Sequence, residues 1–110
     1  MKDLFEAAAG YVKAGWCQGI SARRGNVACQ FDHDFATCFC AAGAIARVAK
    51  AWRGSAWREL YSEALAYANK HIRATDPKLH LMSWNDVPER TQDDVVALLH
   101  AIAVEVACVR

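Results

Sequence analysis

The pattern of hydrophobic and polar residues along the chain is helical in four stretches. In each of them apolar residues recur three and four positions apart, as on the buried face of an amphipathic helix. The four stretches are residues 3–14, residues 36–52, the segment from Ser55 to Ile72, and the segment from Thr91 almost to the C-terminus. The pattern therefore predicts four helices that share one core.

Local signals mark the ends of these predicted helices. Gly15 follows the first helix, where a left-handed backbone conformation often ends a helix. Asp32, Asp34 and Thr37 are candidate N-caps for the second helix. The sequence Thr91-Gln92-Asp93-Asp94 is a capping signature with acidic residues in the first turn, which favours a helix start there.

Two long segments, residues 16–35 and 73–90, lack any periodicity. Loops of this length are unusual in a small domain, so the first segment is expected to form a functional surface or to hide a short element. The best candidate for such an element is Val27 to Phe31. The second segment contains several apolar residues, which predicts that it packs against the helices.

The chain has 110 residues, about the size of one domain, and is too short to divide into two hydrophobic cores. Residues 1–110 are therefore expected to form a single all-α domain. We predict a bundle of four helices, with the two irregular segments gathered at the second helix and the last helix closing the core.

Composition and charge exclude several classes of protein. The formal net charge of +1 provides no field that would draw the chain to nucleic acid or to an anionic membrane. No apolar run has the length of a membrane span, and acidic residues near the N-terminus argue against a signal peptide. The five cysteines are an odd number, which favours reduced thiols and a cytoplasmic location. Nothing in the sequence calls for a cofactor.

Three short motifs occur in an order that resembles a known family. They are Trp16-Cys17-Gln18-Gly19, then Cys40-Ala41-Ala42-Gly43-Ala44-Ile45, and then Trp84-Asn85-Asp86 followed by Arg90-Thr91. The chain resembles, over nearly its whole length, a family of small bacterial and bacteriophage proteins of unknown function with the motifs W-x-x-G, C-x-x-G-A-I and W-N-D-x-x-x-R-T. The sequence departs from that pattern in its additional thiols Cys29, Cys38 and Cys108, and in Val87-Pro88-Glu89 before the Arg-Thr pair. The resemblance implies a shared fold and site, and a phage or mobile-element context, but no reaction.

Cys40 is a candidate nucleophile. A thiolate near a helix N-terminus is favoured by the helix dipole, and a histidine with an Asn or Asp orienter would complete a papain-like arrangement. His71, His80, Asn85 and Asp86 supply those residue types. However, Cys40 lies among alanine, glycine and isoleucine, where an inert buried thiol is the more common occupant and desolvation would raise its pKa.

A second alternative is a zinc site formed by Cys29, His33, Cys38 and Cys40, because thiolate and imidazole are the ligands that zinc prefers. The spacing C-x3-H-x4-C-x-C matches no common zinc knuckle or ribbon. In a helix the sulfurs of a C-x-C pair would also point about 200° apart. We therefore favour packing roles for these cysteines.

Cys40, Gly43 and Ala44 form a helix face made only of small side chains. Such a face is typical of the close approach of another backbone, and the expected occupants are Trp16, Trp84 or the last helix. In a helix interior, Gly43 would otherwise cost roughly 1 kcal/mol relative to alanine.

The most suggestive polar cluster is Trp84-Asn85-Asp86 with Arg90. Asn and Asp beside a turn usually bond the local backbone, so this cluster is expected to position the last helix. The functional alternative is a binding pocket between the two irregular segments. Its predicted residues are Trp16, Gln18, Trp84, Asn85, Asp86 and Arg90.

The basic residues Arg23, Arg24, Arg47, Lys50 and Arg53 could form a surface for phosphate or an acidic protein, but no recognition motif accompanies them. They are predicted to be a solvated face. The function that these observations favour is a non-enzymatic binding module with a protein partner, in one version a regulatory or anti-defence adaptor. The alternative is an enzyme with Cys40 as its nucleophile.

Overall fold

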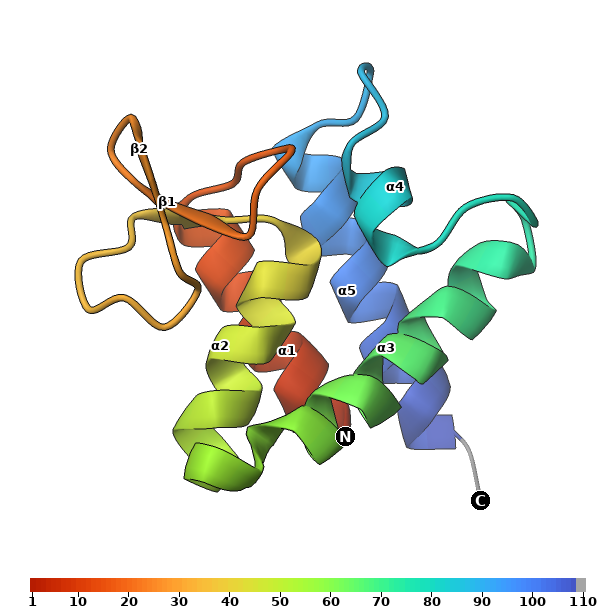
Figure 1. Cartoon of the computed structure of the whole chain (residues 1–110). Helices are drawn as coiled ribbons and strands as arrows, with labels where there is room; N and C mark the ends of the chain where they lie inside the picture. The colour runs from red at the N-terminus through yellow and green to blue at the C-terminus, as the bar shows by residue number, and fades with distance from the viewer. Residues whose placement is uncertain (109–110) are drawn as a thin grey trace.

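A computed structural model describes residues 1–108 of the chain. It contains four long helices, the short helix α4 and a small sheet (Figure 1). The helices are α1 (Lys2–Ala14), α2 (Ala41–Arg53), α3 (Trp57–Arg73), α4 (Leu81–Asn85) and α5 (Gln92–Cys108), with a 3-10 turn η1 (Gly54–Ala56) between α2 and α3. The strands are β1 (Ala22–Arg24), β2 (Val27–Cys29) and β3 (Cys38–Phe39).

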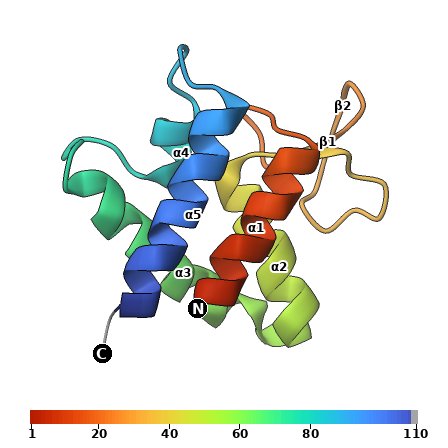
Figure 2. The ribbon, with the colours of Figure 1, turned by 180° about the vertical axis from the view of Figure 1, so that it is seen from behind.

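The four long helices pack around one apolar core. Helices α1 and α5 lie side by side and run in opposite directions, with α2 and α3 against them (Figures 1 and 2). Each helix contributes side chains that are almost fully buried: Leu4, Phe5 and Val12 from α1, Ile45 and Val48 from α2, Ile72 from α3, and Val95, Leu99 and Ile102 from α5. The predicted four-helix core is therefore confirmed. Among the helices of the described residues, none has the length and apolar character needed to cross a bilayer.

The prediction of a purely α-helical domain was wrong, because the first irregular segment contains an antiparallel sheet of strand order β2-β1-β3. Ala22 of the central strand lies opposite Cys29 on one side and Phe39 on the other. The segment proposed for a hidden element, Val27 to Phe31, does contain β2. The sheet satisfies backbone groups that a loop packed against the bundle would leave without partners.

The second helix begins at Ala41, five residues later than predicted. Phe39 instead donates its N–H to the Gly15 carbonyl and pairs with β1. The N-cap of α2 is Cys40, whose sulfur accepts a hydrogen bond from the Gly43 N–H at 3.3 Å. Thr37, one of the predicted caps, accepts the Gly25 N–H at the hairpin turn.

Gly15 does end α1, but its backbone is extended rather than left-handed, with φ of −176°. The reason for a glycine is the close approach of β3, because a Cβ at this position would lie 2.1 Å from the Thr37 carbonyl oxygen. The end of α1 and the start of β3 are therefore packed backbone against backbone.

Candidate functional site

Asn85 joins the two irregular segments to the start of α2. Its side chain is fully buried, and its Oδ1 accepts hydrogen bonds from Trp16 Nε1 at 2.9 Å and from the Ala41 N–H at 3.0 Å. Its Nδ2 donates to the Cys17 carbonyl at 3.2 Å and to Asp86 Oδ1 at 3.0 Å. One amide thus uses all four of its hydrogen-bonding positions on three separate parts of the chain.

Further hydrogen bonds hold the segment around Gln18 against the turn after α4. Gln18 Nε2 donates to the Asn85 carbonyl at 3.0 Å and to the Val87 carbonyl at 2.9 Å. The Gly19 N–H donates to Asp86 Oδ1 at 2.9 Å. The structure therefore brings together the two segments that the sequence placed at one site.

Arg90 and Trp84 form the outer part of this cluster. The Arg90 Nε donates to the Trp84 carbonyl at 2.9 Å, and its guanidinium lies 3.7 Å from the centroid of the Trp84 ring, a cation–π contact. These contacts stabilise the turn that leads into α5. Polar groups of Trp16, Gln18, Asn85 and Arg90 are thus bonded to other protein atoms.

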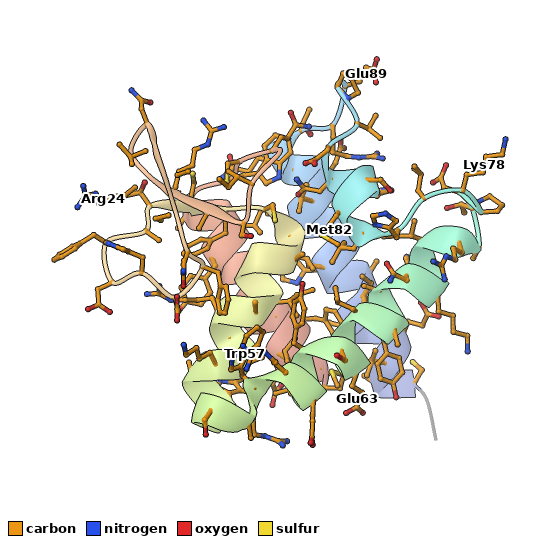
Figure 3. The ribbon with its side chains drawn as sticks, in the orientation of Figure 1. Arg24, Trp57, Glu63, Lys78, Met82 and Glu89 are labelled. Atoms are coloured by element: carbon orange, nitrogen blue, oxygen red, sulfur yellow. The ribbon has the colours of Figure 1, made fainter. Side chains whose placement is uncertain are left out.

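A pocket of about 320 Å³ opens beside the buried amide, between α2, the first turns of α3, α4 and the segment at Gly19. In Figure 3 the labelled Trp57 lies near the start of α3, beside α2, and Met82 lies on α4 above α3. The lining residues are Gly19, Ile20, Ser21, Phe31, Cys40, Ala42, Gly43, Ala46, Trp57, Tyr61, Met82 and Asp86. Of the six predicted binding residues, Asp86 lines the pocket itself, whereas Trp16, Gln18, Trp84, Asn85 and Arg90 are not among the lining residues.

Three partly buried aromatic side chains contribute to this pocket. The rings of Phe31 and Trp57 lie 4.9 Å apart, and those of Trp57 and Tyr61 lie 5.5 Å apart in an edge-to-face arrangement. Phe31 is held in place by Arg47, whose Nη1 donates to the Phe31 carbonyl at 3.1 Å. Burial raises the pKa of Tyr61, which further favours its neutral hydroxyl.

Asp86 is the charged residue among those that line the pocket. Its side chain is exposed, and its Oδ1 accepts the two hydrogen bonds from Gly19 and Asn85. These two donors fix the orientation of the carboxylate. Within residues 1–108, no hydrogen bond to its Oδ2 is formed, so that oxygen is available to a ligand.

Cys40 lines the same pocket but is only 7% exposed. Burial raises the pKa of its thiol, and although the N–H groups of Gly43 and Ala42 lower it, the negative charge of Asp86 raises it further. Within the described part of the pocket lining, no histidine accompanies it. The Cys–His arrangement considered from the sequence is therefore not assembled in this structure.

The two histidines proposed as its partners have other contacts. His71 forms a hydrogen bond with Glu105 of α5. His80 precedes α4 and forms a reciprocal capping box with Ser83. Within residues 1–108, neither imidazole forms a hydrogen bond with Cys40.

The proposed zinc set is not assembled either. Residues 1–108 contain no group of three or more His, Cys, Asp or Glu side chains that could hold a metal ion. His33 Nδ1 accepts the Phe35 N–H at 3.1 Å. Cys38 lies next to Cys17, and burial, together with the Cys38 thiol, raises the pKa of Cys17 to about 12. Cys17 is thus a buried, protonated thiol at neutral pH.

The small face of α2 is explained by close backbone packing, as the sequence predicted. A Cβ on Gly43 would lie 2.0 Å from the Ser21 carbonyl oxygen. The occupant differs from the prediction, since it is the chain entering β1 and not Trp16, Trp84 or the last helix. The Cys40 N–H donates to the same Ser21 carbonyl at 3.1 Å, so this contact also fixes the pocket floor.

Two of the five basic residues form contacts within the protein. Arg47 Nη1 donates to the carbonyls of Phe31 and His33, and Lys50 forms an ion pair with Asp32. They hold the connection between β2 and β3 against α2. The side chains of Arg23, Arg24 and Arg53 are exposed, as expected of a solvated face.

The sequence did not single out the aromatic part of the pocket. Trp57 and Tyr61 belong to the apolar stripe of α3, where large side chains usually belong to the core. Phe31 lies in a segment without periodicity. No local signal separates such residues from core residues, because their role depends on the angle between α2 and α3.

A family model described as "Family of unknown function (DUF6197)" matches residues 1–105. No curated protein and no solved structure matches the chain.

Proposed function

The chain belongs to DUF6197, a family of unknown function, and this membership assigns no activity. From the pocket, we propose that this protein is a non-enzymatic binding module. The observation that carries the proposal is the pocket of about 320 Å³ between α2, α3 and α4. Its volume lies at the lower end of the range of roughly 300–1,000 Å³ that is typical of ligand pockets.

The construction of the pocket supports a binding role. Its rim at Asp86 is fixed by hydrogen bonds from Gly19 and Asn85, so the carboxylate is oriented before a ligand arrives. A preorganised polar group loses little conformational entropy on binding. Apolar walls with few, well-placed polar groups are the usual composition of a binding pocket.

A fragment screen followed by protein NMR would test this proposal. We expect small aromatic fragments to shift the backbone amide signals of Gly19 and Gly43 and the indole signal of Trp57. Ala46→Phe, which places a ring in the pocket, should abolish these shifts, whereas Ala51→Phe on the exposed side of the same helix should not. Shifts that avoid the pocket, or that persist in Ala46→Phe, would contradict the proposal.

A cysteine-dependent enzyme is the second candidate, because the Cys40 sulfur lies at the N-terminus of α2 and lines the pocket. A raised thiol pKa opposes it, since less thiolate is present at neutral pH. The absence of a histidine among the described lining residues removes the usual base.

Thiol labelling separates the two candidates. In the native protein we expect Cys40 to react with iodoacetamide at least about tenfold more slowly than the exposed Cys108, and to react freely after unfolding. Peptide mapping by mass spectrometry measures both rates in the same sample. Faster alkylation of Cys40 than of Cys108 would favour the enzyme and contradict the binding module.

The cellular location and the biological role of this module are also proposals. The five cysteines are free thiols, which fits a reducing compartment and supports a cytoplasmic location. A protein partner, and a regulatory or anti-defence role in phage or mobile-element biology, remain predictions. A side chain of such a partner could enter the pocket in the same way as a free small molecule.

A further inference from the structure

We propose that the pocket between α2, α3 and α4 binds an organic cation, that is, an ammonium group on an apolar stem. This inference rests on the proposed function, since it names the chemical class of the ligand. It follows from the charge, the aromatic content and the hydrogen bonding of the lining residues.

The negative charge in the pocket lining favours a cationic ligand. Asp86 carries a negative charge, and the other residues that line the pocket are neutral. The Oδ1 of Asp86 accepts hydrogen bonds from the Gly19 N–H and from Asn85 Nδ2, whereas no donor within residues 1–108 forms a hydrogen bond with its Oδ2. A charged hydrogen bond from an ammonium group to this carboxylate is stronger than one from a neutral donor.

The aromatic content of the lining also suits a cation with an apolar stem. Phe31, Trp57 and Tyr61 form a continuous cluster, with neighbouring ring centroids 4.9 and 5.5 Å apart. The faces of aromatic rings attract cations, and clusters of such rings recognise alkylated ammonium groups. Arg58 already forms such a contact, 4.9 Å from the Trp57 ring centroid, although it does not line the pocket.

Met82 adds an adaptable apolar side chain to the lining of the pocket. Met82 belongs to α4 and is 50% exposed (Figure 3). A thioether on a flexible chain fits ligands of different shape. The apolar stem of the ligand would therefore lie between Met82 and the aromatic cluster.

The start of α2 does not offer an anion site, even though a helix N-terminus commonly binds anions. The Ala41 N–H donates to Asn85 Oδ1, and the Gly43 N–H donates to Cys40 Sγ. The Cys40 N–H is bonded to the Ser21 carbonyl. Because these three donors already have partners and the Asp86 carboxylate lines the same pocket, the start of α2 is a poor site for a carboxylate or phosphate.

The experiment compares probes that share a shape and differ in charge. Binding of phenethylammonium, the neutral 2-phenylethanol and the anionic phenylacetate is measured by isothermal titration calorimetry and by the NMR shifts of Gly19 and Gly43. We expect the cation to bind at least about tenfold more tightly than the alcohol, and the anion not to bind. Nα-acetyl-lysine-N-methylamide, in which the α-amino group is blocked and the ε-ammonium is free, serves as a second cationic probe. Tighter binding of this probe would assign the cation to a protein side chain, and tighter binding of phenethylammonium to a free amine.

Asp86→Asn provides the matched variant, because an amide oxygen can still accept the hydrogen bonds from Gly19 and Asn85 while the charge is removed. We expect it to reduce the affinity for phenethylammonium about tenfold, and to reduce the affinity for 2-phenylethanol, whose hydroxyl carries no charge, by much less. Asp34→Asn, the same charge change on an exposed loop residue, should change neither.

Equal binding of the cation and the alcohol, with no effect of Asp86→Asn, would overturn the inference of a cationic ligand and leave the binding module standing. Tight binding of phenylacetate would overturn it in the same way. If no probe of any charge shifts the pocket signals, both the inference and the proposed function are contradicted.

Discussion

Asn85→Ala is expected to lower the free energy of unfolding by about 3–5 kcal/mol, which would be the largest effect of any substitution in the polar cluster. The variant leaves the Trp16 Nε1, the Ala41 N–H and the Cys17 carbonyl without their partner. Each buried polar group left unsatisfied costs roughly 1–3 kcal/mol. Because all three parts of the chain meet at this one side chain, no neighbouring residue can replace it.

Urea denaturation followed by tryptophan fluorescence measures this loss. Asn69→Ala is the matched control, since the Asn69 Oδ1 makes one hydrogen bond, to the Leu81 N–H at 2.7 Å. We expect that control to cost about 1 kcal/mol. A loss in Asn85→Ala no larger than in Asn69→Ala would show that the buried amide does not hold the two segments together.

The helical part of the fold could be predicted because its signal is long. Each of the four long helices carries an apolar stripe over three or more turns, and core residues such as Leu4, Ile72 and Leu99 repeat at its period. The predicted start of the second helix is too early because Cys38 is apolar and continues the stripe of that helix. Its actual cap is a cysteine sulfur, whereas the usual N-cap residues are Ser, Thr, Asp and Asn.

The sheet could not be predicted because its strands have only two or three residues. A period of two needs about four residues to be visible in a sequence. The central strand has one buried residue, Ala22, followed by two exposed arginines, so it shows no alternation. The sheet forms because tertiary contacts at Gly15 and Gly43 hold it against the helices.

The polar half of the site was visible in the sequence and the apolar half was not. Asn85 and Asp86 follow Trp84 in an irregular segment, where polar residues without a periodic role stand out. Trp57 and Tyr61 follow the helical stripe and resemble core residues. Separating a pocket wall from a core requires knowing which helix lies opposite, and that information is in the packing of α2 against α3.

Gly43→Ala is expected to lower the free energy of unfolding by about 2–3 kcal/mol, although alanine is normally the better helix former. The added Cβ would lie 2.0 Å from the Ser21 carbonyl oxygen. That oxygen belongs to the backbone and accepts the Cys40 N–H, so it cannot rotate away as a side chain would. Relief of the clash requires the chain before β1 to move, and this movement breaks the hydrogen bond at the N-cap of α2.

Gly10→Ala on α1 is the matched control because, apart from its chain neighbours and the nearby backbone of its own helix, a Cβ there has no atom within 4 Å. It should raise the free energy of unfolding by about 0.5–1 kcal/mol through helix propensity alone. Thermal unfolding should show opposite shifts for the two variants, with a loss of about 10 °C or more for Gly43→Ala. Gly43→Leu should cost still more. If both alanine variants are stabilised equally, Ser21 does not restrict position 43, and the floor of the pocket is not the rigid contact that the binding of a small ligand requires.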